Sequence, residues 1–186
     1  MGIQRYRRVS KRLGVAGFVA MFDQPIGASR RVPLYTAEQR RRRDASPWTL
    51  VQGVLAPLQF LVFFASVILV VRYLASGEGL GIATASIILK TFILYAIMIT
   101  GAIWENDVFG RYLFAPAFFW EDAVSMIVIA LHTAYLVMLV AGIGTPGQQL
   151  VMALAGYAVY VVNAAQFVWK LRLARLDECR GQEAVA

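Results

Sequence analysis

The chain has 186 residues, of which 59% are hydrophobic and only 16% are charged, and its formal net charge is +7. Ordinary soluble domains contain about 25% charged residues, so this composition excludes a typical soluble globular protein and favours an integral membrane protein. The single cysteine, Cys179, excludes an intramolecular disulfide and a multi-cysteine metal site. No nucleic-acid partner is expected.

Residues 1–46 form a basic, mostly polar arm, with "RRVSKR" near the start and four arginines at 40–43. We expect this arm to be cytoplasmic and partly disordered. Its charge either fixes the membrane topology or attracts anionic lipid. The first twenty residues mimic the basic head and small-residue stretch of a signal peptide, and a native start at Met21 is an open alternative.

Four apolar stretches follow, at 48–74, 82–104, 119–143 and 149–169. Each is long enough to cross a bilayer as a helix, and none alternates apolar and polar residues as a membrane strand does. Ser46 and Pro47 suit the N-cap and first position of the first helix. The sequence therefore predicts an all-α, integral membrane four-helix bundle over residues 47–170, followed by a short cytoplasmic tail at 171–186.

Basic residues predict the orientation of this bundle. Nearly all Lys and Arg residues lie before the first span, in the second connection or after the last span, whereas the connections "ASGEG" and "GIGTPG" contain none. By the positive-inside rule, both termini and the 105–118 connection are cytoplasmic. The four tryptophans (Trp48, Trp104, Trp120 and Trp169) are expected at the same interface, which indole rings prefer.

Three carboxylates lie where the second and third spans meet this interface. Glu105 ends the second stretch, and Glu121 and Asp122 begin the third, so an antiparallel hairpin returns them to one depth. Interfacial carboxylates often only face water and headgroups. Ionisable residues in a membrane segment are nevertheless functional-site candidates, and we treat all three as candidate catalytic residues.

His132, the only histidine, lies eleven residues after Glu121, which places both on one helix face about 16 Å apart. We count it as a fourth catalytic candidate. Three roles are open for it: a hydrogen-bonding contact between helices, a proton-transfer group, or an axial ligand to a magnesium or iron tetrapyrrole. Lys90, near the far side of the second span, is expected to extend its amine outward to the interface.

Polar residues also recur along the first and fourth spans. Gln52, Gln59 and Ser66 are spaced by seven, and Asn163 and Gln166 continue a run spaced by three. We expect Gln59 and Ser66 to form hydrogen bonds between helices. Gln52, Asn163 and Gln166 are candidate substrate-binding residues beside the carboxylates.

A carboxylate cluster partly removed from water allows one group to hold a proton while its neighbour stays ionised. Such a pair can add water to, or remove it from, a carbon–carbon double bond. Protonation of an electron-rich vinyl group gives a cation at the inner carbon, and a base delivers water to it. No metal or redox cofactor is required.

Several strings extend this interpretation: "DASPWTLVQGVLAPLQF", "TGAIWE", "FGRYLFAPAFFWEDAVSM", "ALHTAY" and "NAAQF". Over residues 35–175, the chain resembles the 3-vinyl (bacterio)chlorophyllide hydratases of anoxygenic phototrophic bacteria. The resemblance implies hydration of the C3 vinyl group to a 3-(1-hydroxyethyl) group in bacteriochlorophyll a biosynthesis. It also implies a multi-pass protein of the bacterial inner membrane (cytoplasmic or intracytoplasmic), magnesium only as part of the substrate, and other enzymes of that biosynthesis as partners.

The resemblance assigns no catalytic residue, so the roles are hypotheses from the residues themselves. Glu121 protonates the vinyl terminus and Glu105 or Asp122 activates water, with Glu105 and Glu121 interchangeable. His132 binds the magnesium or orients an acid. The substrate ring lies among Phe119, Trp120 and the adjacent Phe118, and Arg111 or Lys170 meets its propionate.

Two other functions fit the same residues. A non-catalytic pigment-binding or photosystem assembly protein would use His132 as a pigment ligand. A small transporter would use Lys90, His132 and Glu121 as a transmembrane relay, but the chain lacks a clear inverted repeat.

Overall fold

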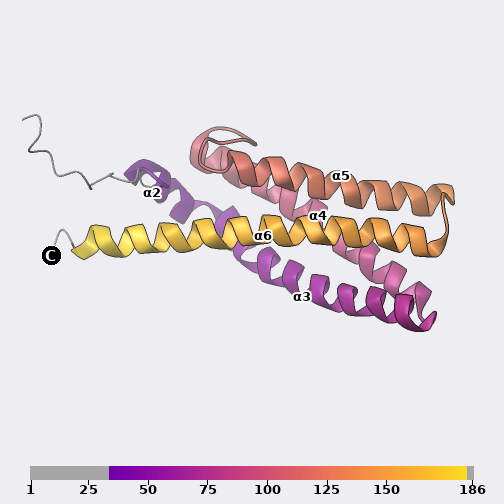
Figure 1. Ribbon diagram of the computed structural model, residues 1–186. Coiled ribbons are helices and arrows are strands. Elements are labelled where there is room, and N and C mark those ends of the chain that lie inside the picture. The colour runs from indigo at the N-terminus through magenta and orange to yellow at the C-terminus, as the bar shows by residue number, and fades with distance from the viewer. Residues whose placement is uncertain (1–33, 184–186) are drawn as a thin grey trace, which may run out of the picture. The chain divides into compact units, whose positions relative to one another are not determined.

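The computed structural model describes residues 34–183, with side chains through residue 176 (Figure 1). Within this range all regular structure is helical, which confirms the predicted all-α class. The arm before residue 34, with the question of the native start, lies outside the described residues. So does the side chain of Cys179.

Four of the helices are long and apolar enough to cross a membrane, as the sequence predicts. These helices are α3 (Pro47–Ser76), α4 (Leu80–Phe109), α5 (Phe119–Ala141) and α6 (Pro146–Glu183). Helix α4 continues past Trp104 to Phe109, where Gly110 adopts the left-handed conformation that commonly ends helices. Glu105 is therefore inside a helix and not at its end. Helix α6 likewise continues through residues 171–183.

A short helix, α2 (Ala37–Ala45), precedes the bundle and contacts α4. A capping box begins it: the Thr36 hydroxyl accepts from the Gln39 N–H at 3.2 Å, and the Gln39 amide oxygen accepts from the Thr36 N–H at 2.9 Å. Hydrogen bonds from Arg41 and Arg42 lower the pKa of the exposed Glu38 carboxyl. The arginine run therefore lies on a folded helix over these residues.

Ser46 occupies the N-cap of α3 and Pro47 its first position, as predicted. The Ser46 hydroxyl does not cap the helix, however. It donates to Asp107 near the end of α4 at 2.7 Å. This bond ties the start of α3 to the end of α4.

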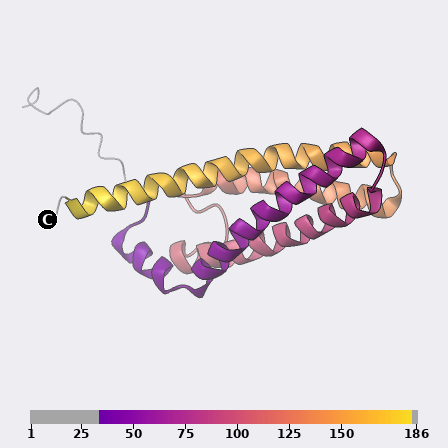
Figure 2. The same cartoon turned by 90° about the horizontal axis from the view of Figure 1, so that it is seen from below.

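The helices pack as two antiparallel hairpins, α3 beside α4 and α5 beside α6, and the hairpins meet through contacts of α4 with α5 and α3 with α6 (Figures 1 and 2). Large apolar side chains such as Leu61 and Val140 point outward and are 69% and 87% exposed. Such exposure fits a lipid environment, in which the backbone is satisfied within each helix.

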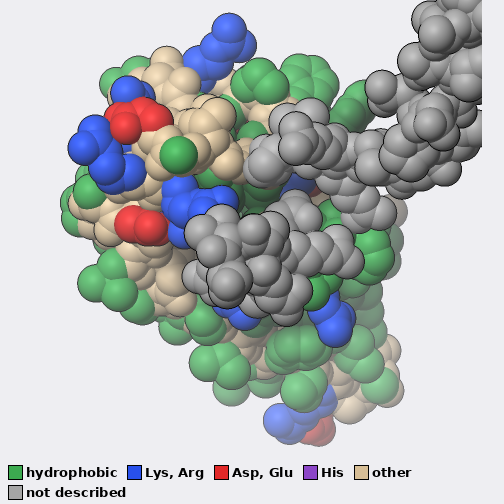
Figure 3. All heavy atoms as spheres, turned by 90° about the vertical axis from the view of Figure 1, so that its left-hand side faces the viewer, with side chains coloured by type: hydrophobic (Ala, Val, Ile, Leu, Met, Phe, Trp, Pro, Cys, Tyr) green, Lys and Arg blue, Asp and Glu red, His purple; other side chains and the backbone are tan. Residues whose placement is uncertain are grey.

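The two ends of the bundle differ. The turn end carries the short connections after Ser76 and Ala141. The carboxylate end, as we name it, comprises the start of α3, the end of α4, the 110–118 loop and the start of α5. Viewed from the side that bears α2, the molecule displays Lys, Arg, Asp and Glu side chains (Figure 3).

Candidate active site

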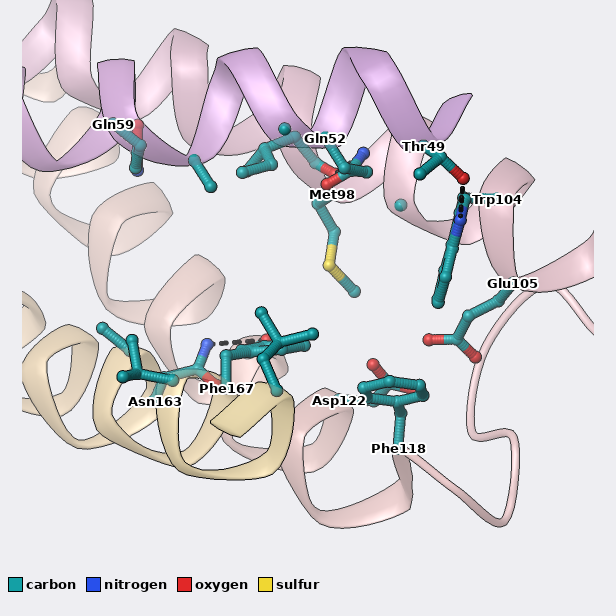
Figure 4. Close-up of a pocket in the computed structure, with 18 of the residues that line it drawn as sticks. Thr49, Gln52, Gln59, Met98, Trp104, Glu105, Phe118, Asp122, Asn163 and Phe167 are labelled. Carbon is teal, nitrogen blue, oxygen red and sulfur yellow. Dashed lines mark hydrogen bonds between the residues drawn. The ribbon is translucent and has the colours of Figure 1, made fainter. Parts of the chain in front are cut away.

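A cavity of about 770 Å³ opens between the two hairpins at the carboxylate end. Helices α3 to α6 and the 110–118 loop all contribute to its wall (Figure 4). Most of the wall is apolar and includes Phe60, Leu94, Met98, Phe118 and Phe167. A largely apolar cavity of this size with a few polar groups is typical of a small-molecule site.

Glu105 from α4 and Asp122 from α5 both line this cavity, although only 5% and 3% of each residue is exposed. The two carboxyl groups face the same space between the hairpins (Figure 4). When two buried carboxyl groups share an apolar space, one can hold a proton while its neighbour stays ionised. The arrangement therefore allows one of them to act as an acid and the other as a base.

Backbone N–H groups of the 110–118 loop donate hydrogen bonds to both carboxyl groups. The Phe114 N–H donates to Asp122 Oδ2 at 2.7 Å, and the Ala115 N–H donates to Glu105 Oε2 at 3.2 Å. Phe114 has a φ of 57°, a left-handed conformation that is strained for a residue with a bulky side chain. The strained backbone points two successive N–H groups at the pair.

Glu121 is also buried, but it pairs with a lysine and does not line the cavity. Its Oε2 accepts from Lys170 Nζ on α6 at 2.5 Å, and Lys170 donates as well to the Ala117 carbonyl. Neither Glu121 nor Lys170 is among the cavity-lining residues. Lys170 is expected as one possible partner of the substrate propionate, but in this structure its ammonium group is bonded to Glu121 and Ala117.

The remaining substrate-binding candidates divide between the cavity and the outside. Gln52 lines the cavity and donates to Thr100 at 2.7 Å, and Asn163 lines it and donates to Ser125 at 2.7 Å. Gln166 does not line it. Arg111, Phe119 and Trp120 are exposed and do not line it either.

Of the three aromatic residues expected around the substrate ring, Phe118 lines the cavity and its two neighbours do not. Sequence reasoning missed other lining residues. Trp104 faces the cavity with its indole N–H bonded to Thr49 at 2.9 Å. Arg43 and Arg175 provide basic groups in the wall. Arg175 lies one helical repeat beyond Leu171 on the face of α6 that carries Asn163 and Phe167, and this spacing is a usable signal.

Hydrogen bonds between helices are expected for both Gln59 and Ser66, and the structure confirms this for Ser66 only. The Ser66 hydroxyl bonds to Ser86 at 2.7 Å and to Tyr157 at 2.6 Å, across helices. Gln59 lines the cavity and is 2% exposed, yet its amide nitrogen and oxygen have no hydrogen-bond partner among the described residues. The hydrogen bond between helices predicted for Gln59 is therefore wrong.

Lys90 and His132 pair in the core, outside the cavity wall. Both are fully buried, and Lys90 Nζ lies 3.3 Å from His132 Nε2. His132 Nδ1 lies 2.8 Å from the Val128 carbonyl oxygen, so Nδ1 carries a proton and Nε2 accepts from Lys90. The prediction that Lys90 reaches outward is wrong, because its amine also lies 4.0 Å from the centroid of the Tyr160 ring.

Both His132 nitrogens are thus engaged by protein groups in this structure. Within the described part of the chain, no three His, Cys, Asp or Glu side chains gather where they would hold a metal ion.

Comparisons with known proteins agree with the resemblance in the sequence. A family described as 2-vinyl bacteriochlorophyllide hydratase, whose vinyl group is the 3-vinyl group named above, matches residues 35–173. Among the described residues, that match covers the whole cavity lining except Ala174 and Arg175.

Two curated relatives have the same name, 2-vinyl bacteriochlorophyllide hydratase. The one from Cereibacter sphaeroides is 69% identical over 144 residues, which cover 77% of this chain and 89% of the relative. The one from Rhodobacter capsulatus is 62% identical over 157 residues, which cover 84% and 91%. No solved structure matches the chain.

Proposed function

Because the chain belongs to the 2-vinyl bacteriochlorophyllide hydratase family, we propose that it adds water to the vinyl group of a chlorophyllide or bacteriochlorophyllide. In the product, a 1-hydroxyethyl group replaces the vinyl group at C3 of the macrocycle, as bacteriochlorophyll a biosynthesis requires. The observation that carries the mechanism is that two buried carboxyl groups, those of Glu105 and Asp122, line one largely apolar cavity.

Glu105 is the acid and Asp122 the base in this mechanism. The shorter backbone hydrogen bond to Asp122, 2.7 Å against 3.2 Å, favours the ionised form there. Glu105 gives its proton to the terminal vinyl carbon, and the positive charge develops on the inner carbon beside the macrocycle. Asp122 takes a proton from water as the oxygen bonds to that carbon.

The cycle closes without another reagent. After the addition, Glu105 is ionised and Asp122 holds the proton from water. Transfer of this proton from Asp122 to Glu105, which lines the same cavity, restores the starting pair. Water and the alkene are consumed in equal amounts, and no electron transfer occurs.

Glu121 is the competing acid. It adjoins Asp122 in sequence, and its bond to Lys170 holds it in place. In that version Lys170 releases Glu121 when the substrate arrives. The two versions differ in which substitution removes activity.

The substrate ring fits between the apolar faces of the two hairpins, against Met98 and Phe167 (Figure 4). Its propionate meets Arg43 or Arg175 in the cavity wall. The reaction uses magnesium only as a part of the tetrapyrrole and needs no redox cofactor.

The protein lies in the cytoplasmic or intracytoplasmic membrane of a bacterium, with both termini and the 110–118 loop on the cytoplasmic side. The distribution of basic residues supports this orientation. Its substrate enters from that side, and other enzymes of bacteriochlorophyll biosynthesis supply it and take up the alcohol.

The direct test is to incubate membranes containing this protein with 3-vinyl chlorophyllide a in oxygen-18 water and to analyse the pigment by mass spectrometry. We expect a protein-dependent gain of one labelled water. Membranes without the protein, and ordinary water, are the controls. Pigment that co-purifies with the protein but gains no water would instead establish the non-catalytic binding protein.

A further inference from the structure

Gln59 presents an unused primary amide to the cavity. Its side chain is almost fully buried, and neither amide atom has a partner among the described residues. A buried amide without a hydrogen bond destabilises a folded protein, and helix contacts normally satisfy it. A ligand that supplies the missing hydrogen-bond partner would explain why an amide side chain is buried at position 59.

The free amide lies at the opposite end of the cavity from the acid–base pair. In Figure 4, Gln59 and Asn163 are on one side, and Glu105 and Asp122 are on the other. Thr49 bonds to Trp104, the residue before Glu105, and Gln59 lies ten residues, or about 15 Å, further along α3. The cavity therefore has polar groups at both ends, and the wall between them is mostly apolar, with Gln52 as a polar exception.

The lining residues beside Gln59 on α3, which are Ala56, Pro57 and Phe60, are uncharged. Asn163, on the same side of the cavity in Figure 4, is also uncharged, and its Oδ1 is buried without a partner among the described residues. The basic lining residues are Arg43 and Arg175. A propionate suits the arginines. A neutral oxygen acceptor suits an amide N–H.

We propose that Gln59 binds the ring ketone of the (bacterio)chlorophyllide and so directs the vinyl group toward Glu105 and Asp122. The vinyl group and the ketone lie on opposite edges of the planar macrocycle, as the two polar ends of the cavity require. The Gln59 Nε2–H donates to the ketone oxygen. The inference rests on the proposed function for the identity of the ligand, and Gln59 is a positioning residue for the reaction.

The test measures pigment binding and needs no turnover. Full-length wild type and Gln59→Leu are titrated, by quenching of pigment fluorescence, with 3-vinyl chlorophyllide and with the same pigment reduced to lack the ketone oxygen. Wild type is expected to bind the ketone pigment about tenfold more tightly than the deoxygenated pigment. In Gln59→Leu the two affinities become equal, because leucine cannot donate a hydrogen bond.

Thermal unfolding without ligand separates this role from a structural one. We expect Gln59→Leu to unfold at the wild-type temperature or above it, because an unsatisfied amide is removed. The matched control is Gln149→Leu at the turn end, where the amide donates to the Met138 and Ile143 carbonyls. That variant is expected to unfold at a lower temperature and to keep the tenfold preference for the ketone.

A preference for the ketone that survives in Gln59→Leu would overturn the proposal, as would a wild type without any preference. An equal loss of affinity for both pigments with a lowered unfolding temperature would make Gln59 structural and would overturn it too. If the preference depends on Gln59 but no water is added to the vinyl group, the subsite stands and the hydratase proposal fails.

Discussion

Backbone N–H groups hold the side chains of Glu105 and Asp122 in place beside the cavity. Each comes from a different helix, and each accepts an N–H from the 110–118 loop, so neither has to be held by a charged partner. Glu121, one residue from Asp122, has Lys170 instead. Adjacent carboxylates in one sequence string thus have different environments, and this difference assigns their roles.

Substitution of the carboxylates tests that assignment. We expect Glu105→Gln and Asp122→Asn each to lower kcat about 10²- to 10⁴-fold, which is the usual contribution of a general acid or base. Both amides preserve shape, so pigment binding should persist. Glu121→Gln should retain most of the activity, because the residue lies outside the cavity wall.

Rates of water addition and pigment affinity, measured on the same membranes, check this expectation. Loss of activity confined to Glu121→Gln would transfer the acid role to Glu121. Full activity in all three variants would remove the carboxylates from the mechanism.

At the level of the helices, the interface between the α3–α4 hairpin and the α5–α6 hairpin has two parts. At the carboxylate end it opens into the cavity, and deeper in the bundle it is closed by buried polar and aromatic groups. Gly156 on α6 allows the closest approach there, because a Cβ at this position would lie 2.9 Å from two atoms of the His132 ring. Lys90 from α4 and His132 from α5 join the hairpins at this level.

We expect this buried pair to hold the helices together and to take no part in catalysis. Lys90→Met should change stability by about 1 kcal/mol or less and keep turnover, because an apolar replacement of a buried polar contact is often neutral. His132→Ala should destabilise the bundle by about 3 kcal/mol, since it leaves a cavity and an unpaired amine.

Thermal unfolding in lipid nanodiscs, together with turnover per folded molecule, measures both effects. A Lys90→Met protein that folds and binds pigment but does not turn over would place the pair in the reaction path. It would then support the prediction that His132 is catalytic.

For the whole molecule, the functional unit begins close to Tyr35. The family match starts at that residue, and Tyr35 is the first of the described residues to line the cavity. Helix α2 follows at once, and its last turn contributes Arg43 and Asp44 to the same wall.

Two truncations test where the unit begins. Deletion of residues 1–33 is expected to leave pigment affinity and turnover within about twofold of wild type, because the family match and the described lining residues are retained. Deletion of residues 1–46 removes α2 and its lining residues, and we expect it to weaken pigment binding about tenfold or more. Equal activity of both truncated proteins would exclude α2 from the site.

The sequence by itself determined the four helices and the chemical class of the site. Apolar stretches of bilayer length can satisfy their backbones only as helices, so local composition decides this part of the fold. Hairpin geometry likewise placed Glu105 near Asp122, because the ends of consecutive antiparallel helices return to one depth. The strings around "FFWEDAVSM" indicated the family, which the comparisons confirm.

Only the tertiary structure decided which polar groups meet. Helical spacing assigns residues to a face but does not say which partner that face meets, and every face here is mostly apolar. Hence Gln59 and Ser66, seven residues apart, share one pattern, yet one is unpaired in a cavity and the other bonds to Ser86 and Tyr157. Lys90 turns inward because α5 and α6 supply an imidazole and aromatic rings, and no feature of its own helix specifies them.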